Sequence, residues 1–169
     1  QITEELNNKQ FSIGIFIDLS KAFDTIDHSI LIRKLQHYGI RGIALNWFKS
    51  YLQNRQQYVS IGDNNSYLQF VSCGVPQGSI LGPLLFIVYI NDIANVSKIA
   101  NLIMFADDTN LFYSHDKLDV LCNDINYDLL KISLWFKLNK LSLNVKKTNF
   151  MIFRPKNKKN TKRRNKYKN

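Results

Sequence analysis

The chain has 169 residues, of which 45% are hydrophobic and 21% are charged, so its length and composition are those of one globular domain with a buried core. The longest apolar run, Ile80 to Ile90, contains a Gly-Pro step and is too short to span a bilayer. Cys73 and Cys122 lie far apart without metal-type spacing, so we interpret them as reduced thiols of an intracellular protein. Because the chain begins with Gln1 and not with Met, we expect a piece of a longer protein.

The basic charge is concentrated at the C-terminal end. The formal net charge is +10, but residues 154–169 hold nine Lys and Arg and no acid. Residues 1–153 are therefore almost neutral and are the predicted globular part, while 154–169 are a predicted basic disordered tail. Such a tail binds phosphates or serves as a nuclear address, or it is only a solvated remnant, and the composition leaves these interpretations open.

The first half of the chain predicts a strand, two helices and a hairpin. Apolar residues alternate in the strand and recur at helical spacing in the helices. Asp27 is suited to cap the first helix, and Gly39 to end it in a left-handed conformation. In chain order the elements are the strand Phe11–Asp18, the helices 27–38 and 43–52, and the hairpin of residues 55–62 and 67–73 around Asp63–Ser66.

The second half predicts two helices, a hairpin and a last strand. Pro83 is tolerated because it falls in the first turn of its helix. The elements are the helix 79–93, the hairpin of residues 101–106 and 109–114 with Asp107 and Asp108 at its tip, the amphipathic helix 116–138, and the strand Thr148–Phe153. Together these elements predict an α+β fold, a small antiparallel sheet with helices packed on one face.

The acidic residues carry the candidate chemistry. Asp18 ends an otherwise apolar strand, and Asp107 and Asp108 stand between two apolar runs. A carboxylate buried alone in such surroundings is costly, so each needs a cation or strong hydrogen-bond donors. Asp oxygens are hard ligands of the kind that Mg²⁺ takes together with substrate phosphates. Asp-Asp-Thr-Asn is also good turn chemistry, and taken alone the pair favours a plain turn over a metal site.

Four segments that occur together in one order favour the metal site over the plain turn. They are FIDLSKAFD (16–24), GVPQGS through LGP (74–83), FADD (105–108) and residues 139–148, which end in NVKKT. The ordered set resembles the palm of reverse transcriptases from retrotransposons without long terminal repeats, and residues 38–52 are typical of jockey-like elements. The resemblance covers about Phe11 to Phe153. It implies a polymerase palm with RNA-directed DNA polymerase activity in retrotransposition.

The resemblance also assigns the metal ligands. It implies that Asp18, the backbone carbonyl of Leu19, and Asp107 hold two Mg²⁺ ions, with Mn²⁺ as the alternative, and that Asp108 is a third, auxiliary acid. In this two-metal scheme a nucleotidyl group is transferred from a dNTP to the 3′-hydroxyl of a DNA primer on an RNA template, and pyrophosphate leaves. Phosphoryl transfer depends mainly on positioning and charge neutralisation, which paired metals supply.

Four more residues receive roles from the resemblance. Phe23 stands where the family places the bulky residue that excludes a ribose 2′-hydroxyl, although by itself it is better explained as core. Gln77 and Gly78 are implied to line the nucleotide pocket, with a plain Pro-Gln-Gly turn as the alternative. Lys147 is implied to protonate the leaving pyrophosphate, a contribution of about 10²–10⁴-fold for general acids. Lys146 is the competing counterpart, and a surface lysine is the default for both.

The chain departs from the family's pattern outside the palm. The family's fingers segment before the first motif, its thumb after the fourth and its endonuclease are not expected within residues 1–169. We therefore expect the remainder of a parent polyprotein as a partner, no membrane, and a nuclear location for the parent. Two other hypotheses are a non-catalytic retrotransposon fragment and a basic nucleic-acid-binding module that works through residues 154–169.

Overall fold

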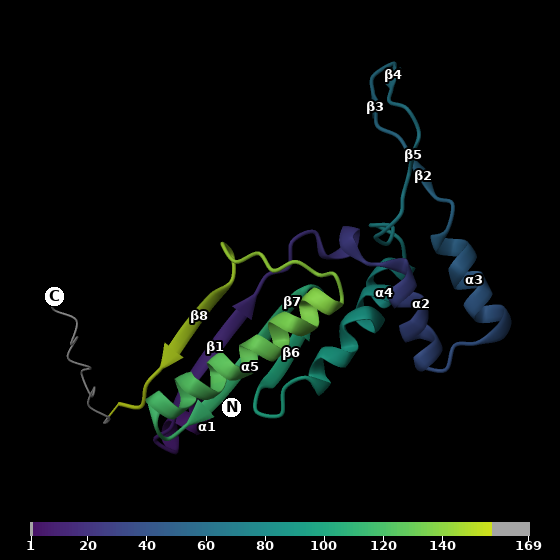
Figure 1. Ribbon diagram of the computed structural model, residues 1–169. Coiled ribbons are helices and arrows are strands. Elements are labelled where there is room, and N and C mark those ends of the chain that lie inside the picture. The colour runs from purple at the N-terminus through teal and green to yellow at the C-terminus, as the bar shows by residue number, and fades with distance from the viewer. Residues whose placement is uncertain (1, 157–169) are drawn as a thin grey trace, which may run out of the picture.

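The computed structural model describes residues 2–156, which fold around a four-stranded antiparallel sheet (Figure 1). The strand order is β6-β7-β1-β8, so the first strand of the chain lies between two later ones. The strands are β1 (Phe11–Ile17), β6 (Asn101–Phe105), β7 (Asp108–His115) and β8 (Asn149–Phe153). The predicted α+β class is confirmed.

The described helices form two groups. In Figure 1, α5 lies along the sheet, while α2, α3 and α4 stand together to one side of it. The α-helices are α1 (Ile2–Asn7), α2 (His28–His37), α3 (Gly42–Leu52), α4 (Leu81–Ile90) and α5 (Leu118–Leu138), and the 3₁₀ helices are η1 (Ala22–Thr25) and η2 (Asn91–Asn95).

One face of the sheet carries the apolar core and packs against α5. The register pairs Ile13 with Tyr113 and Ile15 with Leu111, and residues directly opposite in antiparallel strands share a face. All four side chains are buried, and burial of each of the three aliphatic ones stabilises the fold by roughly 1.5–3 kcal/mol. The Tyr113 hydroxyl donates a 2.9 Å hydrogen bond to Oδ2 of Asp128 on α5, which fixes the helix on this face.

The opposite face of the sheet is open and partly aromatic. Phe16 and Phe112 meet edge to face with their ring centroids 6.0 Å apart. Gly14 lies beneath them, and a Cβ at that position would come within 3.0 Å of the Phe112 ring. Phe105 is 79% exposed and Met151 52% exposed. We call this the open face, although Ser12, near its other end, is fully buried.

The second helix group has its own anchoring contacts. The Asp27 carboxylate caps α2 by accepting a 2.9 Å hydrogen bond from the Ile30 amide, as the sequence predicts. Gly39, with φ +93°, lies beyond the end of the same helix in the predicted left-handed conformation. Leu31 and Leu35 of α2 are buried in the same core as Phe86 of α4, so the two helices share their apolar faces.

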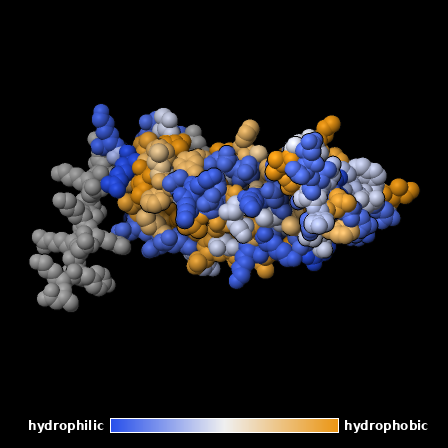
Figure 2. Space-filling model, turned by 90° about the horizontal axis from the view of Figure 1, so that it is seen from above, coloured by the Kyte–Doolittle hydropathy of each residue, from blue (hydrophilic) through white to orange (hydrophobic). Residues whose placement is uncertain are grey.

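A narrow arm, residues 53–72, projects away from the body (Figure 1). Its strands are only two residues long: β2 (Gln56–Gln57) pairs with β5 (Gln69–Phe70), and β3 (Ser60–Ile61) with β4 (Asn64–Asn65). The predicted hairpin is confirmed, but its turn is Gly62–Asp63 and its ladder is interrupted. In Figure 2, apolar patches lie on the surface around the arm and near β8.

Some element bounds differ from the sequence prediction. The helix predicted over 79–93 begins only at Leu81, because the Ser79 hydroxyl accepts a 3.0 Å hydrogen bond from the Gly82 amide and so caps the turn. It ends at Ile90, where η2 takes over. Helix α1 and η1 are not predicted by the pattern. No helix within residues 2–156 is long and apolar enough to cross a membrane. The predicted tail falls mostly on residues 157–169, which lie outside the described residues, and the division at residue 153 stays a prediction.

Candidate active site

Two of the predicted acids lie on neighbouring strands at one end of the sheet. Ile17, the last residue of β1, pairs with Thr109 of β7. Asp18 follows Ile17 and Asp108 precedes Thr109, so the two acids occupy adjoining positions on neighbouring antiparallel strands. Ile17 and Thr109 are buried on the α5 side of the sheet. Side chains alternate along a strand, so Asp108 belongs to the open face, and Asp18, one residue beyond the end of β1, continues the same alternation.

The third acid lies in the turn that joins β6 to β7. Phe105 pairs with Asp108, which leaves Ala106 and Asp107 as a two-residue hairpin turn. Ala106 has φ +52°, the left-handed value that the first central residue of a type II′ turn adopts. Asp108 is therefore the first residue of β7 and not part of the tip, which corrects the prediction by one residue. The strained turn holds Asp107 directly beside Asp108.

The segment 139–148 runs along the backbone that follows β1. The Asn144 amide donates to the Asp18 carbonyl at 2.9 Å, and the Ser20 amide donates to the Ser142 carbonyl at 2.8 Å. These two bonds enclose an isolated antiparallel bridge between Leu19 and Leu143. In this pattern the amide and carbonyl of Leu19 point away from Leu143. The Leu19 carbonyl therefore remains available for another partner.

The two candidate lysines follow within the same segment. Lys146 and Lys147 are both exposed. The Lys147 amide donates to the Asn144 carbonyl at 3.0 Å, and Asn144 is the residue bonded to Asp18. The backbone of Lys147 is thus linked to the backbone of Asp18 by two hydrogen bonds, through Asn144.

The second predicted motif lies against η1. The Val75 amide donates to the Phe23 carbonyl at 2.9 Å, and the Gln77 side-chain amide donates to Oδ1 of Asp24 at 2.7 Å. Gly74 has φ +84°, and a Cβ there would meet the Asp24 carbonyl oxygen at 2.8 Å, so only glycine allows this close approach. The chain thus brings Gln77 to the segment that follows Asp18.

Phe23 has a neighbour in the core. Its ring lies 4.8 Å, centroid to centroid, from that of Phe86 on α4, and Phe23 itself is half-buried. One side of the ring therefore packs against the core, and the remaining surface is accessible. Gly78 has φ +78°, and a Cβ added there would meet no atom within 4 Å, so the space beside Gly78 is open.

A cleft of about 590 Å³ lies beside η1 and the base of the arm. Gln77 and Asp24 contribute one wall, whereas Phe23 and Gly78 are not part of it. Its other polar lining includes Lys21, Arg55 and Gln57. The two cations Lys21 and Arg55 outnumber the one carboxylate in the lining, that of Asp24, which favours an anionic ligand.

The predicted site residues therefore form two neighbouring groups. Asp18, Leu19, Asp108 and Lys147 are linked through strand register and backbone bonds, and Phe23 and Gln77 are linked through η1. Within residues 2–156, no three carboxylate, imidazole or thiol groups are already gathered as a metal cluster. Asp24, which holds Gln77, has no predicted role, although it ends the first motif.

These features are those of a known enzyme family. Over residues 2–167 the sequence matches the family described as reverse transcriptase (RNA-dependent DNA polymerase). Because the match spans nearly the whole chain, the chain belongs to this family.

The relatives point to retrotransposons. The chain is 31% identical over 160 residues to the probable RNA-directed DNA polymerase from transposon BS of Drosophila melanogaster, covering 87% of this chain and 17% of that protein. It is 32% identical over 113 residues to the RNA-directed DNA polymerase from mobile element jockey of the same fly, covering 63% and 12%. The resemblance to jockey-like elements is confirmed, and a basic binding module is not favoured. The chain spans less than a fifth of these relatives.

A solved structure supports the fold. Telomerase from Candida albicans, in complex with a fragment of telomeric RNA, aligns with a TM-score of 0.62 at 14% sequence identity. The alignment covers 89% of this chain and 29% of that one. At this low identity the likeness concerns the fold alone, and it confirms the predicted polymerase palm.

Proposed function

We propose that this chain is the catalytic palm of an RNA-directed DNA polymerase, in which Asp18, Asp107 and Asp108 bind the divalent ions for nucleotide addition. The observation that carries the proposal is the position of Asp18 and Asp108 on the open face, at the same end of adjacent strands and beside the turn that bears Asp107. The substrates would be an RNA template, a DNA primer and a dNTP. The remainder of the parent polyprotein would supply fingers, thumb and endonuclease.

The donor set fits Mg²⁺, with Mn²⁺ as the alternative. Carboxylate oxygens and a backbone carbonyl are hard ligands, and the Leu19 carbonyl is turned away from its neighbour Leu143. Carboxylates close enough to share a metal ion repel one another unless a cation lies between them. We therefore expect the carboxylates of Asp18, Asp107 and Asp108 to move closer together when metal binds. When bound, two such ions activate the primer hydroxyl and neutralise charge on the triphosphate.

The nucleotide would lie between the acids and the segment 74–78. Phe23, braced by Phe86, offers a rigid ring that would meet a ribose 2′-hydroxyl and so select deoxynucleotides. Gln77, fixed by Asp24, and Gly78 would line the same pocket. Lys147, on the segment bonded to Asp18, would protonate the departing pyrophosphate, with Lys146 as the competing candidate.

The decisive experiment is primer extension on an RNA template by the longer retrotransposon protein that contains this domain. Asp18→Asn should lower the extension rate by at least about 100-fold because a metal ligand is lost. Asp63→Asn, in the exposed turn of the arm, is the matched control and should leave the rate unchanged. Extension by Asp18→Asn at the wild-type rate would refute the proposed metal site.

Two further experiments separate the nucleotide roles from packing. Phe23→Ala should raise ribonucleotide incorporation relative to deoxyribonucleotide, and an unchanged ratio would mean that Phe23 serves only the core. Lys147→Ala and Lys146→Ala should differ, with the larger loss of rate identifying the general acid. Equal and small losses would assign neither lysine to proton transfer. A nuclear location of the parent protein stays a prediction.

A further inference from the structure

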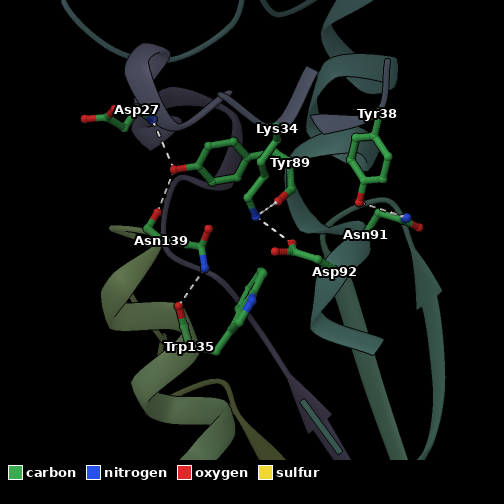
Figure 3. A network of polar contacts seen from close by, with 8 residues as sticks. All are labelled: Asp27, Lys34, Tyr38, Tyr89, Asn91, Asp92, Trp135 and Asn139. Carbon is green, nitrogen blue, oxygen red and sulfur yellow. Dashed lines mark hydrogen bonds and ion pairs between the residues drawn. The ribbon is translucent and has the colours of Figure 1, made fainter. Parts of the chain in front are cut away.

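A single buried hydroxyl joins three elements away from the acids. Tyr89 of α4 is fully buried, and its hydroxyl donates a 2.7 Å hydrogen bond to the Asn139 carbonyl at the end of α5. The same oxygen accepts a 3.4 Å hydrogen bond from the amide of Asp27, which precedes α2 (Figure 3). Burial raises the pKa of Tyr89 to about 12, so the hydroxyl stays a proton donor at neutral pH.

A second contact reinforces the first at the next residue of the chain. Lys140 follows Asn139, and its Nζ lies 2.6 Å from Oδ2 of Asp27. Oδ1 of Asp27 accepts from the Ile30 amide, so the carboxylate caps α2 and pairs with Lys140 at once. We call these two contacts, Tyr89 to Asn139 and Asp27 to Lys140, the clasp. It holds the point where the chain leaves α5.

Lys34 braces the clasp from α2. Its ammonium donates to the Tyr89 carbonyl at 2.5 Å and to the Asp92 carboxylate at 2.6 Å. It also lies 4.8 Å from the centroid of the Trp135 ring (Figure 3). Because Lys34 contacts α4, η2 and α5 together, Tyr89 cannot shift without breaking bonds on several elements.

The clasp stands at the start of the segment that reaches Asp18. Four residues beyond Lys140, the Asn144 amide is bonded to the Asp18 carbonyl, and Ser142 lies between them bonded to Ser20. At the other side of the clasp, Asp27 forms an isolated bridge with Cys73, next to the segment 74–78. The clasp therefore connects both groups of proposed site residues.

We infer that Tyr89 and Asp27 are positioning residues for nucleotide transfer. They hold the start of the segment that carries Lys147, and they tie that segment to residues 73–78 through Asp27. Tyr89 is fully buried and acts through the Asn139 carbonyl, whereas Asp27 acts through its ion pair with the Lys140 side chain and its backbone bridge with Cys73. This inference rests on the proposed polymerase function.

The test compares two buried tyrosines in the longer protein. Tyr89→Phe removes the clasp hydroxyl. Tyr113→Phe is the matched control, because its hydroxyl is also buried and also donates one hydrogen bond, to Asp128, but it lies on the α5 face of the sheet. Three quantities are measured for each: stability in denaturant, kcat and KM for dNTP in primer extension, and hydrogen–deuterium exchange of peptides covering residues 18–20 and 141–148.

Tyr89→Phe should lower kcat about tenfold, the loss expected when one hydrogen bond no longer positions reacting groups, with less than about a twofold change in KM. Exchange in 18–20 and 141–148 should rise. Tyr113→Phe should lose at least as much stability as Tyr89→Phe, but its kcat and its exchange rates in residues 18–20 and 141–148 should stay within about twofold of the wild-type values. Asp27→Asn keeps an oxygen that caps α2 but loses the ion pair with Lys140, so its kcat and exchange rates should lie between those of the wild type and Tyr89→Phe.

Three outcomes would overturn the inference. They are a kcat for Tyr89→Phe within about twofold of wild type, an equal loss of kcat in Tyr113→Phe, and unchanged exchange in 141–148. If the wild-type protein itself fails to extend a primer, the proposed function fails, while the exchange data still show whether the clasp holds the segment.

Discussion

Gly74→Ala tests how closely the segment 74–78 approaches η1. Gly74 has φ +84°, and an alanine there costs about 1–2 kcal/mol for the left-handed backbone. The added Cβ would also lie 2.8 Å from the Asp24 carbonyl oxygen and 2.9 Å from its Cα, both backbone atoms that cannot swing away. Overpacking of this kind costs about 1–3 kcal/mol, so the total loss should be about 2–5 kcal/mol.

Gly39→Ala separates the two contributions. Gly39 has φ +93°, and no atom lies within 4 Å of where its Cβ would be, so only the backbone cost of about 1–2 kcal/mol applies. The reduced entropy of the unfolded chain acts in both variants and cancels in the comparison. The free energy of unfolding of each variant is measured by urea titration. Equal losses in the two variants would refute the tight contact between Gly74 and Asp24.

The remaining predictions concern single residues and pH. Ala106→Gly should raise the free energy of unfolding by up to about 1 kcal/mol, measured in urea, because it relieves the left-handed φ of the turn, and a loss of stability would contradict that geometry. The hydrogen bond from Lys140 holds the pKa of Asp27 below its usual value. The ion pair therefore stabilises the fold above the unfolded pKa of Asp27, and this stabilisation disappears as the pH falls through the folded pKa. Lys140→Met should be less stable than wild type by about 0.5–1 kcal/mol at pH 7 and equally stable at acid pH. Burial raises the pKa of Tyr89 to about 12. The contribution of its protonated hydroxyl to folding stability is therefore complete below about pH 10, the pKa in the unfolded chain, and is lost between pH 10 and 12. The free energy of unfolding of Tyr89→Phe, measured by denaturant titration at stepped pH, should decline less steeply over this range than that of the wild type.

The sequence predicts those features that depend on neighbouring residues. Alternation places Ile13 and Ile15 on one face of β1, and the capping preference of Asp27 and the left-handed preference of Gly39 mark the ends of α2. Each of these rests on sterics or hydrogen bonds within a few positions. The placement of Asp18 at a strand end and of Asp107 in a hairpin turn follows from the same logic, whereas Asp108 lies one residue outside the turn. Their role as metal ligands comes only from the resemblance and stays a prediction.

The sequence does not predict contacts between distant segments. Tyr89 lies in a continuous apolar run that indicates burial but not the partners of its hydroxyl, which stand 62 positions before and 50 positions after it. Helix η1 escapes prediction because it is only four residues long and begins after Lys21 at φ +50°, a conformation with no signal in that residue type. The arm has shorter strands than predicted, because alternating apolar residues indicate long strands even where no third strand or helix covers them.

The sheet order has a consequence for how the chain folds. The central strand β1 leaves the ribosome well before both of its partners, because β7 and β8 come from the other end of the described chain. Loop-closure entropy must be overcome before such distant pairings form, so this high contact order should make folding slow. Throughout that interval β1 presents two unpaired edges and a row of isoleucines, which invites association with other nascent chains. We therefore expect the domain to depend on chaperones during synthesis, and any truncation before Phe153 to aggregate rather than fold.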